Sequence, residues 1–271
     1  MKIDELERLM VDQNPQWQTG ESKLASLDFR RELFESVWSD LTSHRLITTV
    51  SGVRRIGKTY LLKQLMQALM EREAIAPFAT LYFQFSTRMN EPEILRNLIA
   101  LYEQKYAPKS ASLFIFLDEI QYLDFWQDQV KMLYDLQPRL KIVVTGSTSL
   151  FHRQKSRESL AGRIIKKKLY SLSFAEYLMF RGLKNNLPHN RAEFIRALTV
   201  LRSEFPRYLY RGQFPELVIN DRLAPIDYLQ SLLDQVINFD IAYIHTTLDR
   251  TLFFNVFKAL SFSIANEYSI S

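Results

Sequence analysis

Short apolar runs alternate with helical patterns along the first part of the chain. Five runs are rich in β-branched, aliphatic or aromatic side chains and are short enough for strands. They lie at residues 46–50, 79–85, 112–117, 141–146 and 164–169. Apolar residues at the helical period separate the first four, at residues 61–70, 92–102 and 127–136. Strands that alternate with helices predict repeated βαβ units and therefore a parallel sheet.

The pattern differs on either side of these strands. Residues 1–45 are mostly helical in pattern and lead into the first strand. From residue 173 onward the strand-like runs give way to helical ones. We therefore predict two domains, an α/β core at residues 1–172 and a helical region at residues 173–271. An apolar stripe at residues 252–260 is typical of a core or an interface rather than a cofactor site.

A phosphate-binding pattern follows the first predicted strand. The spacing G-x-x-x-x-G-K-[ST] is that of the P-loop, whose backbone N–H groups wrap phosphates while the lysine reaches the outer oxygens and the hydroxyl binds Mg²⁺. Its motif positions are Gly52, Gly57, Lys58 and Thr59. The residues expected to surround the nucleotide with them are Val53, Arg54, Arg55, Ile56 and Tyr60. A strand before and a helix after favour this interpretation over a simple tight turn.

Acidic residues follow the third predicted strand, in the sequence LFIFLDEIQYL. Asp118 stands where an α/β sheet places its ligands, and with Glu119 it forms a Walker B signature that would complete the magnesium site of Thr59. A solvated strand end or a helix cap is the alternative. Glu119 favours hydrolysis over kinase chemistry, since a hydrolase needs a group that orients and polarises water.

Hydroxyl side chains follow the fourth predicted strand. Thr145, Ser147 and Thr148 could position the attacking water or contact the γ-phosphate, and of these we name Ser147 as the catalytic candidate. A Ser/Thr-rich turn is also an ordinary strand end, so this alternative stays open. For Arg54 and Arg55 a phosphate contact and a pair with a surface acid are both open.

Composition narrows the class of protein. The chain has 271 residues, 47% of them hydrophobic, with no cysteine and only four scattered histidines. Disulfides and thiolate metal sites are excluded, so any metal is expected to be Mg²⁺ that arrives with nucleotide. The N-terminus is too charged for a signal peptide and no apolar run is long enough for a membrane span, which predicts a cytoplasmic protein without a membrane partner. A net charge of +5 would suit contact with nucleic acid, but the excess is mild and an ordinary basic protein is the favoured interpretation of the charge.

Five motifs in order resemble a known family. They read GVRRIGKTYLLKQL, FIFLDEIQYL, VVTGSTSLF, SLAGRIIKKKLYSLSFAEYL and RGQFPEL. The chain is similar from about residue 25 onward to prokaryotic AAA+ ATPases with G-x-R-x-x-G-K-T, L-D-E-I-Q and G-G-x-P-E motifs. It departs from their P-L-S-F, which reads S-L-S-F here, and from G-G-x-P-E, which reads G-Q-F-P-E.

The resemblance implies a fold and further site residues. It implies a P-loop NTPase of the AAA+ type, with a five-stranded parallel sheet in the order 5-1-4-3-2 and a helical lid after residue 173. By analogy with signalling ATPases, Pro215 with Gly212 is the lid contact to the nucleotide base, although a turn between helices is the alternative. Family members continue into winged-helix and often nuclease-like domains, so we expect this chain to be truncated.

Arg163 stands where AAA+ proteins carry an arginine finger that reaches a neighbouring subunit's γ-phosphate. The alternative is a salt bridge that anchors the loop, for instance to Glu158. The basic stretch at residues 152–168 could likewise contact DNA or be a solvated face, and the second is favoured because no aromatic stacking platform is interleaved there.

The predicted function is an ATP-binding and ATP-hydrolysing AAA+ module that couples turnover to a conformational change in a partner or a C-terminal domain. A slow-turnover signalling switch and, less favoured, a small-molecule kinase are the alternatives. Nucleotide is the predicted partner, and a homo-oligomer and a DNA or protein partner are left open.

Overall fold

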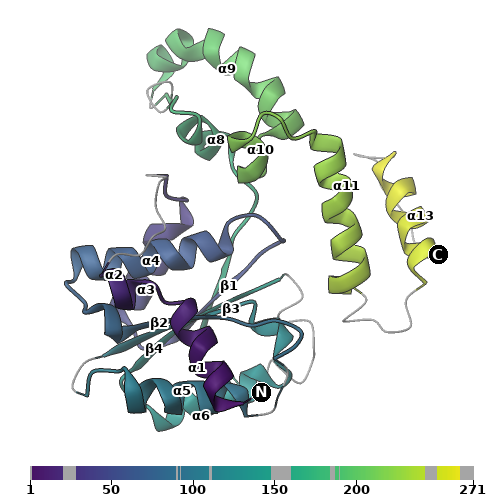
Figure 1. Cartoon of the computed structure of the whole chain (residues 1–271). Helices are drawn as coiled ribbons and strands as arrows, with labels where there is room; N and C mark the ends of the chain where they lie inside the picture. The colour runs from purple at the N-terminus through teal and green to yellow at the C-terminus, as the bar shows by residue number, and fades with distance from the viewer. Residues whose placement is uncertain are drawn as a thin grey trace. The chain divides into compact units, whose positions relative to one another are not determined.

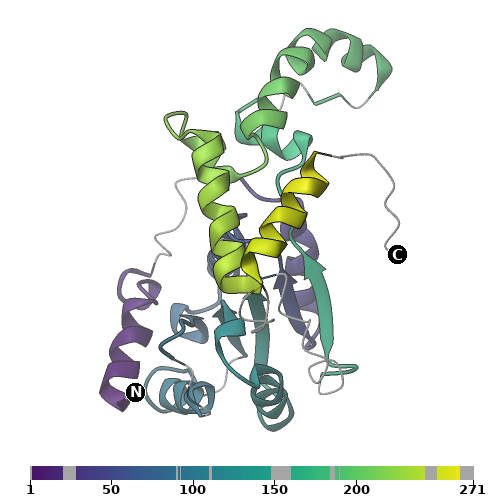
Figure 2. The same cartoon turned by 90° about the vertical axis from the view of Figure 1, so that its right-hand side faces the viewer.

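The computed structural model describes residues 2–20, 29–89, 91, 93–109, 112–147, 160–183, 187–188, 190–241 and 249–262. These residues belong to two compact units, and the boundary between them along the chain falls after Arg222. The first unit is built on a five-stranded sheet, which Figures 1 and 2 show from two directions. The second unit is helical in the part described.

The sheet of the first unit is parallel throughout. Its strands are β1 (Ile47–Ser51), β2 (Thr80–Gln84), β3 (Leu113–Asp118), β4 (Leu140–Gly146) and β5 (Ile164–Lys168). They lie in the order β2-β3-β4-β1-β5, with every neighbouring pair parallel. This is the predicted order 5-1-4-3-2 read from the other edge, so the predicted fold class is confirmed.

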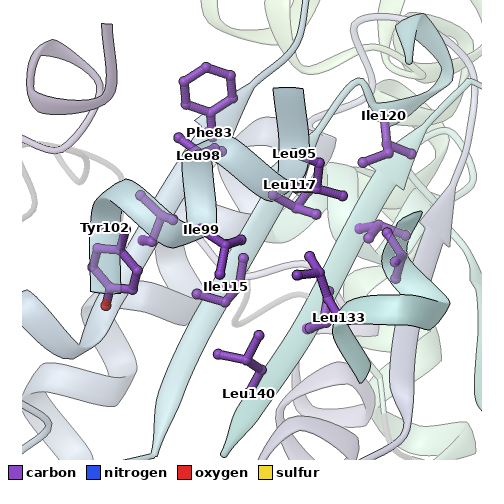
Figure 3. Close-up of a cluster of buried hydrophobic side chains, with 14 of the residues drawn as sticks. Phe83, Leu95, Leu98, Ile99, Tyr102, Ile115, Leu117, Ile120, Leu133 and Leu140 are labelled. Carbon is purple, nitrogen blue, oxygen red and sulfur yellow. The ribbon is translucent and has the colours of Figure 1, made fainter. Parts of the chain in front are cut away.

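Helices cover both faces of the sheet, and β3 is buried along its whole length as a result. The covering helices are α3 (Leu33–Ser43), α4 (Lys58–Arg72), α5 (Ile94–Lys105) and α6 (Trp126–Leu136). Leu113, Ile115 and Leu117 pack in one cluster with residues of α5 and α6, as Figure 3 shows for the last two. Phe114 and Phe116 point to the opposite face, where they pack with residues of α3 and α4. Alternate side chains of one strand thus supply two cores.

The N-terminal helices protect one edge of the sheet. They are α1 (Ile3–Asp12) and α2 (Gln16–Thr19). Asn14, between them, bonds the backbone of the edge strand β2 twice, because its amide donates to the Tyr82 carbonyl oxygen and its carbonyl accepts from the Tyr82 N–H, each at 2.8 Å. The Trp17 indole N–H donates to the Thr80 carbonyl oxygen at 2.9 Å. Side chains thus replace part of the missing neighbour strand, and the backbone of β2 is shielded from pairing with another chain.

Three further helices of the first unit follow β5 and are called the lid here. They are α8 (Phe174–Phe180), α9 (Arg191–Arg211) and α10 (Pro215–Ile219). Leu172, Tyr177, Leu178 and Val218 form a small core of their own, separate from the two cores of the sheet. The chain's division into compact units falls later, after Arg222. The domain boundary at residue 172 therefore stays a prediction.

Short helices and the second unit complete the described structure. Two 3₁₀ turns, η1 (Pro77–Ala79) and η2 (Ile120–Tyr122), precede β2 and follow β3. The second unit contains α11 (Pro225–Gln235), the π-helical η5 (Val236–Ile241) and α13 (Arg250–Ser261). On α13 the apolar side chains of Leu252, Val256, Phe257 and Leu260 are exposed, and the interface expected for this stripe stays a prediction. No helix in the described ranges is long and apolar enough to cross a membrane.

Candidate nucleotide-binding site

The predicted P-loop connects β1 to α4 at the carboxyl edge of the sheet. Gly57 caps α4 with φ +100°, and Arg55 also has a positive φ of 63°. A side chain on Gly52 would put its Cβ 2.5 Å from the Leu169 carbonyl oxygen, so the loop can pass β5 only with glycine there. The chain thus enters α4 by a turn that aims the helix N-terminus, with its N–H groups and positive dipole end, at the loop.

Lys58 folds back over the loop that precedes it. Its ammonium donates to the carbonyl oxygens of Gly52 and Val53, each at 3.1 Å. It also lies 3.8 Å from Glu119 Oε1. With 4% of the residue exposed, this charge is buried among acceptors on the first two loop residues and on the end of β3.

Asp118 is the most heavily bonded carboxylate of the site and is fully buried. Its Oδ2 accepts from the Thr59 hydroxyl at 2.5 Å and from the Tyr82 hydroxyl at 2.9 Å. Its Oδ1 accepts from the Thr145 hydroxyl and from the Glu119 N–H. Burial, together with the charge of Asp118, raises the pKa of Tyr82, which keeps that hydroxyl a neutral donor. Thr59 and Asp118 are therefore in contact, while their role as magnesium ligands stays a prediction.

The donor set at this point fits a magnesium ion. A hydroxyl and a carboxylate are the hard oxygen ligands that Mg²⁺ prefers. Within the described residues no group of three His, Cys, Asp or Glu side chains could hold a metal by itself. A metal at Thr59 and Asp118 would therefore need further ligands, which nucleotide phosphates and water supply.

The carboxylate of Glu119 lies between Lys58, near its Oε1, and Gln121, at its Oε2. The backbone of Glu119 is left-handed, with φ 53°, an uncommon conformation for a residue with a side chain. The Gln121 amide donates to Glu119 Oε2, and the same side chain accepts the Ser147 N–H through its Oε1 at 3.3 Å. Gln121 thus links the acidic end of β3 to the end of β4, where Ser147 is 2% exposed.

The comparisons with known proteins agree with this geometry. Residues 44–178 match the family model described as an AAA domain. These residues form an AAA domain. They include the P-loop, both acidic residues and the end of β4.

Relatives of the chain are longer than the chain itself. An uncharacterized protein of Haemophilus influenzae is 29% identical over 198 residues, which cover 73% of this chain and 46% of that protein. An uncharacterized protein of Methanocaldococcus jannaschii is 30% identical over 214 residues, or 70% of this chain and 42% of that protein. The chain thus spans less than half the length of these relatives.

A solved structure shares the fold of a large part of this chain. The ADP complex of S. cerevisiae Hsp104 aligns with a TM-score of 0.51 at 17% identity, over 88% of this chain and 36% of that one. At this identity the likeness concerns the fold alone.

The next predicted site residues are the loop arginines and the hydroxyl residues at the end of β4. The Arg54 guanidinium donates to the Tyr122 hydroxyl at 2.8 Å. Thr145 contacts Asp118, so its hydroxyl serves the carboxylate. Thr148 lies outside the described residues. Roles in catalysis for Ser147 and in phosphate contact for Arg54 and Arg55 stay predictions.

Pro215 is the first residue of the lid helix α10. Gly212, three residues earlier, lets α9 approach α8 closely, since a Cβ there would lie 2.8 Å from the Tyr177 ring and 2.6 Å from Tyr208 Cα. Phe214 packs against the cluster that contains Ile56 of the P-loop. This segment therefore lies near the AAA domain's loop, while the contact of Pro215 with a base stays a prediction.

Arg163 lies at the amino-terminal ends of the strands, whereas the P-loop lies at their carboxyl ends. It precedes β5, and its carbonyl oxygen accepts the N–H of Ile47, the first residue of β1. Its guanidinium is paired with Asp135 on α6, at 3.0 Å. The anchoring salt bridge is thus to Asp135, while Glu158 lies outside the described residues. A finger acting on a neighbouring subunit stays a prediction.

The lysines of β5 divide between the two faces of the strand. Lys167 pairs with Asp40 of α3 at 2.9 Å, while Lys166 and Lys168 are exposed. The expected alternation is present, but whether the exposed face contacts DNA or only solvent stays a prediction, and residues 152–159 of the basic stretch lie outside the described residues.

Four contacting residues were not foreseen from the sequence. Tyr82 and Gln121 hold the two acidic residues, and Arg31 and Glu176 contact the segment around the loop. A signal existed for Glu176, because S-x-x-E before an apolar run is a capping box, and Ser173 and Glu176 form one. Gln121 stands two residues after Glu119 in the motif LDEIQ, so a local signal existed for it too, whereas Tyr82 and Arg31 lie far along the chain from the residues that they contact.

Proposed function

We propose that the chain binds ATP with Mg²⁺ at the P-loop and hydrolyses its terminal phosphoanhydride bond. The observation that carries this proposal is the meeting of four motif side chains at the carboxyl edge of the sheet. Thr59 lies 2.5 Å from Asp118, and Lys58 lies 3.8 Å from Glu119. A phosphate loop, a metal-ligand pair and a carboxylate that can accept a proton from water are the parts that NTP hydrolysis needs.

Binding follows from the loop and Lys58. Phosphate oxygens would take the place of the Gly52 and Val53 carbonyls as partners of the Lys58 ammonium, since a charged acceptor forms the stronger hydrogen bond. The N-terminus of α4 adds N–H groups and the positive end of its dipole. Thr59 and Asp118 would hold Mg²⁺, which when bound neutralises charge on the phosphates.

Turnover is assigned to Glu119. In this proposal its carboxylate accepts a proton from water as the water oxygen bonds to the γ-phosphorus and the bond to the bridging oxygen breaks, releasing ADP and phosphate. Gln121 acts through Glu119, as a positioning residue that ties the carboxylate to the end of β4.

We propose that the lid transmits the effect of hydrolysis as a conformational change. Closing and opening of helices α8 to α10 would pass the nucleotide state to a partner or to a further domain, in the cytoplasm, where ATP and Mg²⁺ are present. An Arg163 finger would require a homo-oligomer. A slow-turnover switch uses the same site, and a kinase would need an acceptor pocket for its second substrate.

Phosphate release under multiple-turnover conditions tests the proposal. Purified protein with ATP and Mg²⁺ should release phosphate for many cycles, and removal of Mg²⁺ should stop it. A single burst that stops at one phosphate per chain would favour the switch. Faster phosphate transfer to a small acceptor than to water would favour a kinase, and no nucleotide binding at all would overturn the proposal.

A further inference from the structure

A buried ion pair joins three segments of the first unit beside the P-loop. Arg31, just before α3, lies 2.7 Å from Glu176 in the first turn of α8, and these side chains are 7% and 5% exposed. The same guanidinium donates to the Ile56 carbonyl oxygen at 2.8 Å and to the Tyr170 carbonyl oxygen at 2.7 Å. One planar fork thus bonds a lid helix, the phosphate loop and the segment that leaves β5.

Glu176 is fully supplied with donors on its side of the pair. It accepts the N–H of Glu32 at 2.9 Å and the N–H of Ser173 at 3.0 Å, in addition to Arg31. Burial by itself raises the pKa of Glu176, but the hydrogen bonds from Arg31 and from the two backbone groups outweigh it, and the net pKa lies below its ordinary value. The carboxylate therefore stays charged and keeps the guanidinium in place.

The contact with Ile56 fixes the direction of a P-loop amide. The peptide between Ile56 and Gly57 is trans, like all those described. The C=O and N–H of a trans peptide point in opposite directions. A guanidinium that holds the Ile56 carbonyl on one side therefore directs the Gly57 N–H to the other side. The charge-assisted bond also polarises the peptide, which strengthens its N–H as a donor.

We propose that Arg31 is a positioning residue for phosphate binding, and that Glu176 makes the first turn of the lid part of the same support. Arg31 orients the Ile56–Gly57 peptide with its N–H toward phosphate, and Glu176 holds Arg31. Nucleotide binding and the placement of α8 are thereby coupled, since phosphate and the lid favour the same orientation of one side chain. This inference rests on the proposed nucleotide site.

Arg31→Lys tests the orientation directly. A lysine keeps the charge opposite Glu176 but cannot hold three acceptors in a planar fork. We expect the variant to fold, as judged by its thermal transition, and to bind ATP and ADP about tenfold more weakly, the size of one lost orienting hydrogen bond. AMP carries a single phosphate, so its affinity should change least. Titration calorimetry with the three nucleotides measures this.

A matched control is available in the same unit. Arg139 also donates to two backbone carbonyls, of Pro108 and Lys109, and to one carboxylate, of Glu103, but on the side of the sheet away from the loop. Arg139→Lys should leave all three affinities unchanged. Hydrogen exchange adds a second readout, because ADP should protect the amides of α8 in the unaltered protein and protect them less in Arg31→Lys.

The outcomes separate this inference from the proposed function. If the unaltered protein binds none of the three nucleotides, both are overturned. If it binds them and Arg31→Lys weakens all three by the same factor, or none, the positioning role is wrong while the nucleotide site stands. Should Arg31→Lys fail to fold, Glu176→Gln replaces it, because the amide oxygen can still accept from Arg31 and Glu32 while the charge that holds Arg31 and the acceptor of the Ser173 N–H are lost. The same loss for ADP and ATP is expected from it.

Discussion

Removal of the Tyr82 hydroxyl measures how strongly the carboxylate of Asp118, the proposed magnesium ligand, is held. Tyr82→Phe deletes the donor that lies 2.9 Å from Asp118 Oδ2 and leaves the ring in its packed position. Hydrogen bonds to charged groups contribute about 1.5–3 kcal/mol, and the loss falls here on a carboxylate with no exposed surface. Because burial and Asp118 raise the pKa of Tyr82, the hydroxyl donates at every pH of interest. We therefore expect the free energy of unfolding to fall by about 1.5–3 kcal/mol.

Two other tyrosines serve as controls, because Tyr→Phe removes the same hydroxyl from a different hydrogen-bond acceptor. Tyr102 donates to a neutral acceptor, the Phe78 carbonyl oxygen, at 2.7 Å, and Tyr102→Phe should cost about 0.5–1.5 kcal/mol. Tyr106 donates at 2.8 Å to Glu7, whose side chain is 23% exposed to solvent. Tyr106→Phe should therefore have the smallest effect of the three, because water replaces the lost hydroxyl.

Urea unfolding followed by tryptophan fluorescence provides the assay. All three tryptophans, Trp17, Trp38 and Trp126, lie in the first unit, so the signal reports the unit that contains the site. The measurement is made without Mg²⁺, so that metal binding does not contribute. The reasoning is refuted if Tyr82→Phe destabilises the protein no more than Tyr106→Phe does.

Three further predictions concern turnover, assembly and pH. Lys58→Ala should abolish nucleotide binding, and Glu119→Gln should keep binding while stopping phosphate release. Lys105→Ala, a control on an exposed lysine, should change neither binding nor release. Phosphate release by Glu119→Gln at the rate of the unaltered protein would show that Glu119 is not the group that activates water. If Arg163 acts across a subunit boundary, ATP hydrolysis per subunit should rise with protein concentration, and a mixture of Arg163→Ala with Lys58→Ala subunits should recover activity. Unchanged hydrolysis by Arg163→Ala in a self-associated sample would exclude the arginine finger. Since the folded-state pKa of Glu176 is lowered from 4.5, its stabilising contribution is present above pH 4.5 and lost as pH falls below it. Glu176→Gln should therefore flatten the acid side of a stability–pH curve, and an unchanged curve would contradict the role of this carboxylate.

The parts of the fold that the sequence predicted are those written in contiguous residues. The loop and its lysine stand next to each other, and β3 is visible as a continuous apolar run, from Leu113 to Leu117, because both faces of this strand are buried. The order of the strands was a different matter. It came from the resemblance of five motifs to a family, since periodicity tells which segments are strands and says nothing of which strands are neighbours.

The rest of the site could not be predicted, because its contacts cross the sheet. Tyr82 and Asp118 lie on neighbouring strands and are brought together only by the pairing of β2 with β3, in which Gln84 stands opposite Asp118. Arg31 and Glu176 are 145 positions apart. No pattern within one element marks either pair. The salt bridge of Arg163 illustrates the same limit, since a salt bridge was one of the two alternatives for this residue while its partner, Asp135 on α6, was not named.

These contacts also bear on what the functional unit is. The AAA domain as matched begins at residue 44 and ends at residue 178, so it includes Glu176 and leaves out Arg31. Without Arg31 the carboxylate of Glu176 would be a buried charge that has lost its partner, and the Ile56 carbonyl would lose its donor. The segment before α3 therefore contacts the loop directly, although the family match leaves it out. A sequence family is defined by residues that can be aligned, whereas the physical site extends as far as the contacts that orient them.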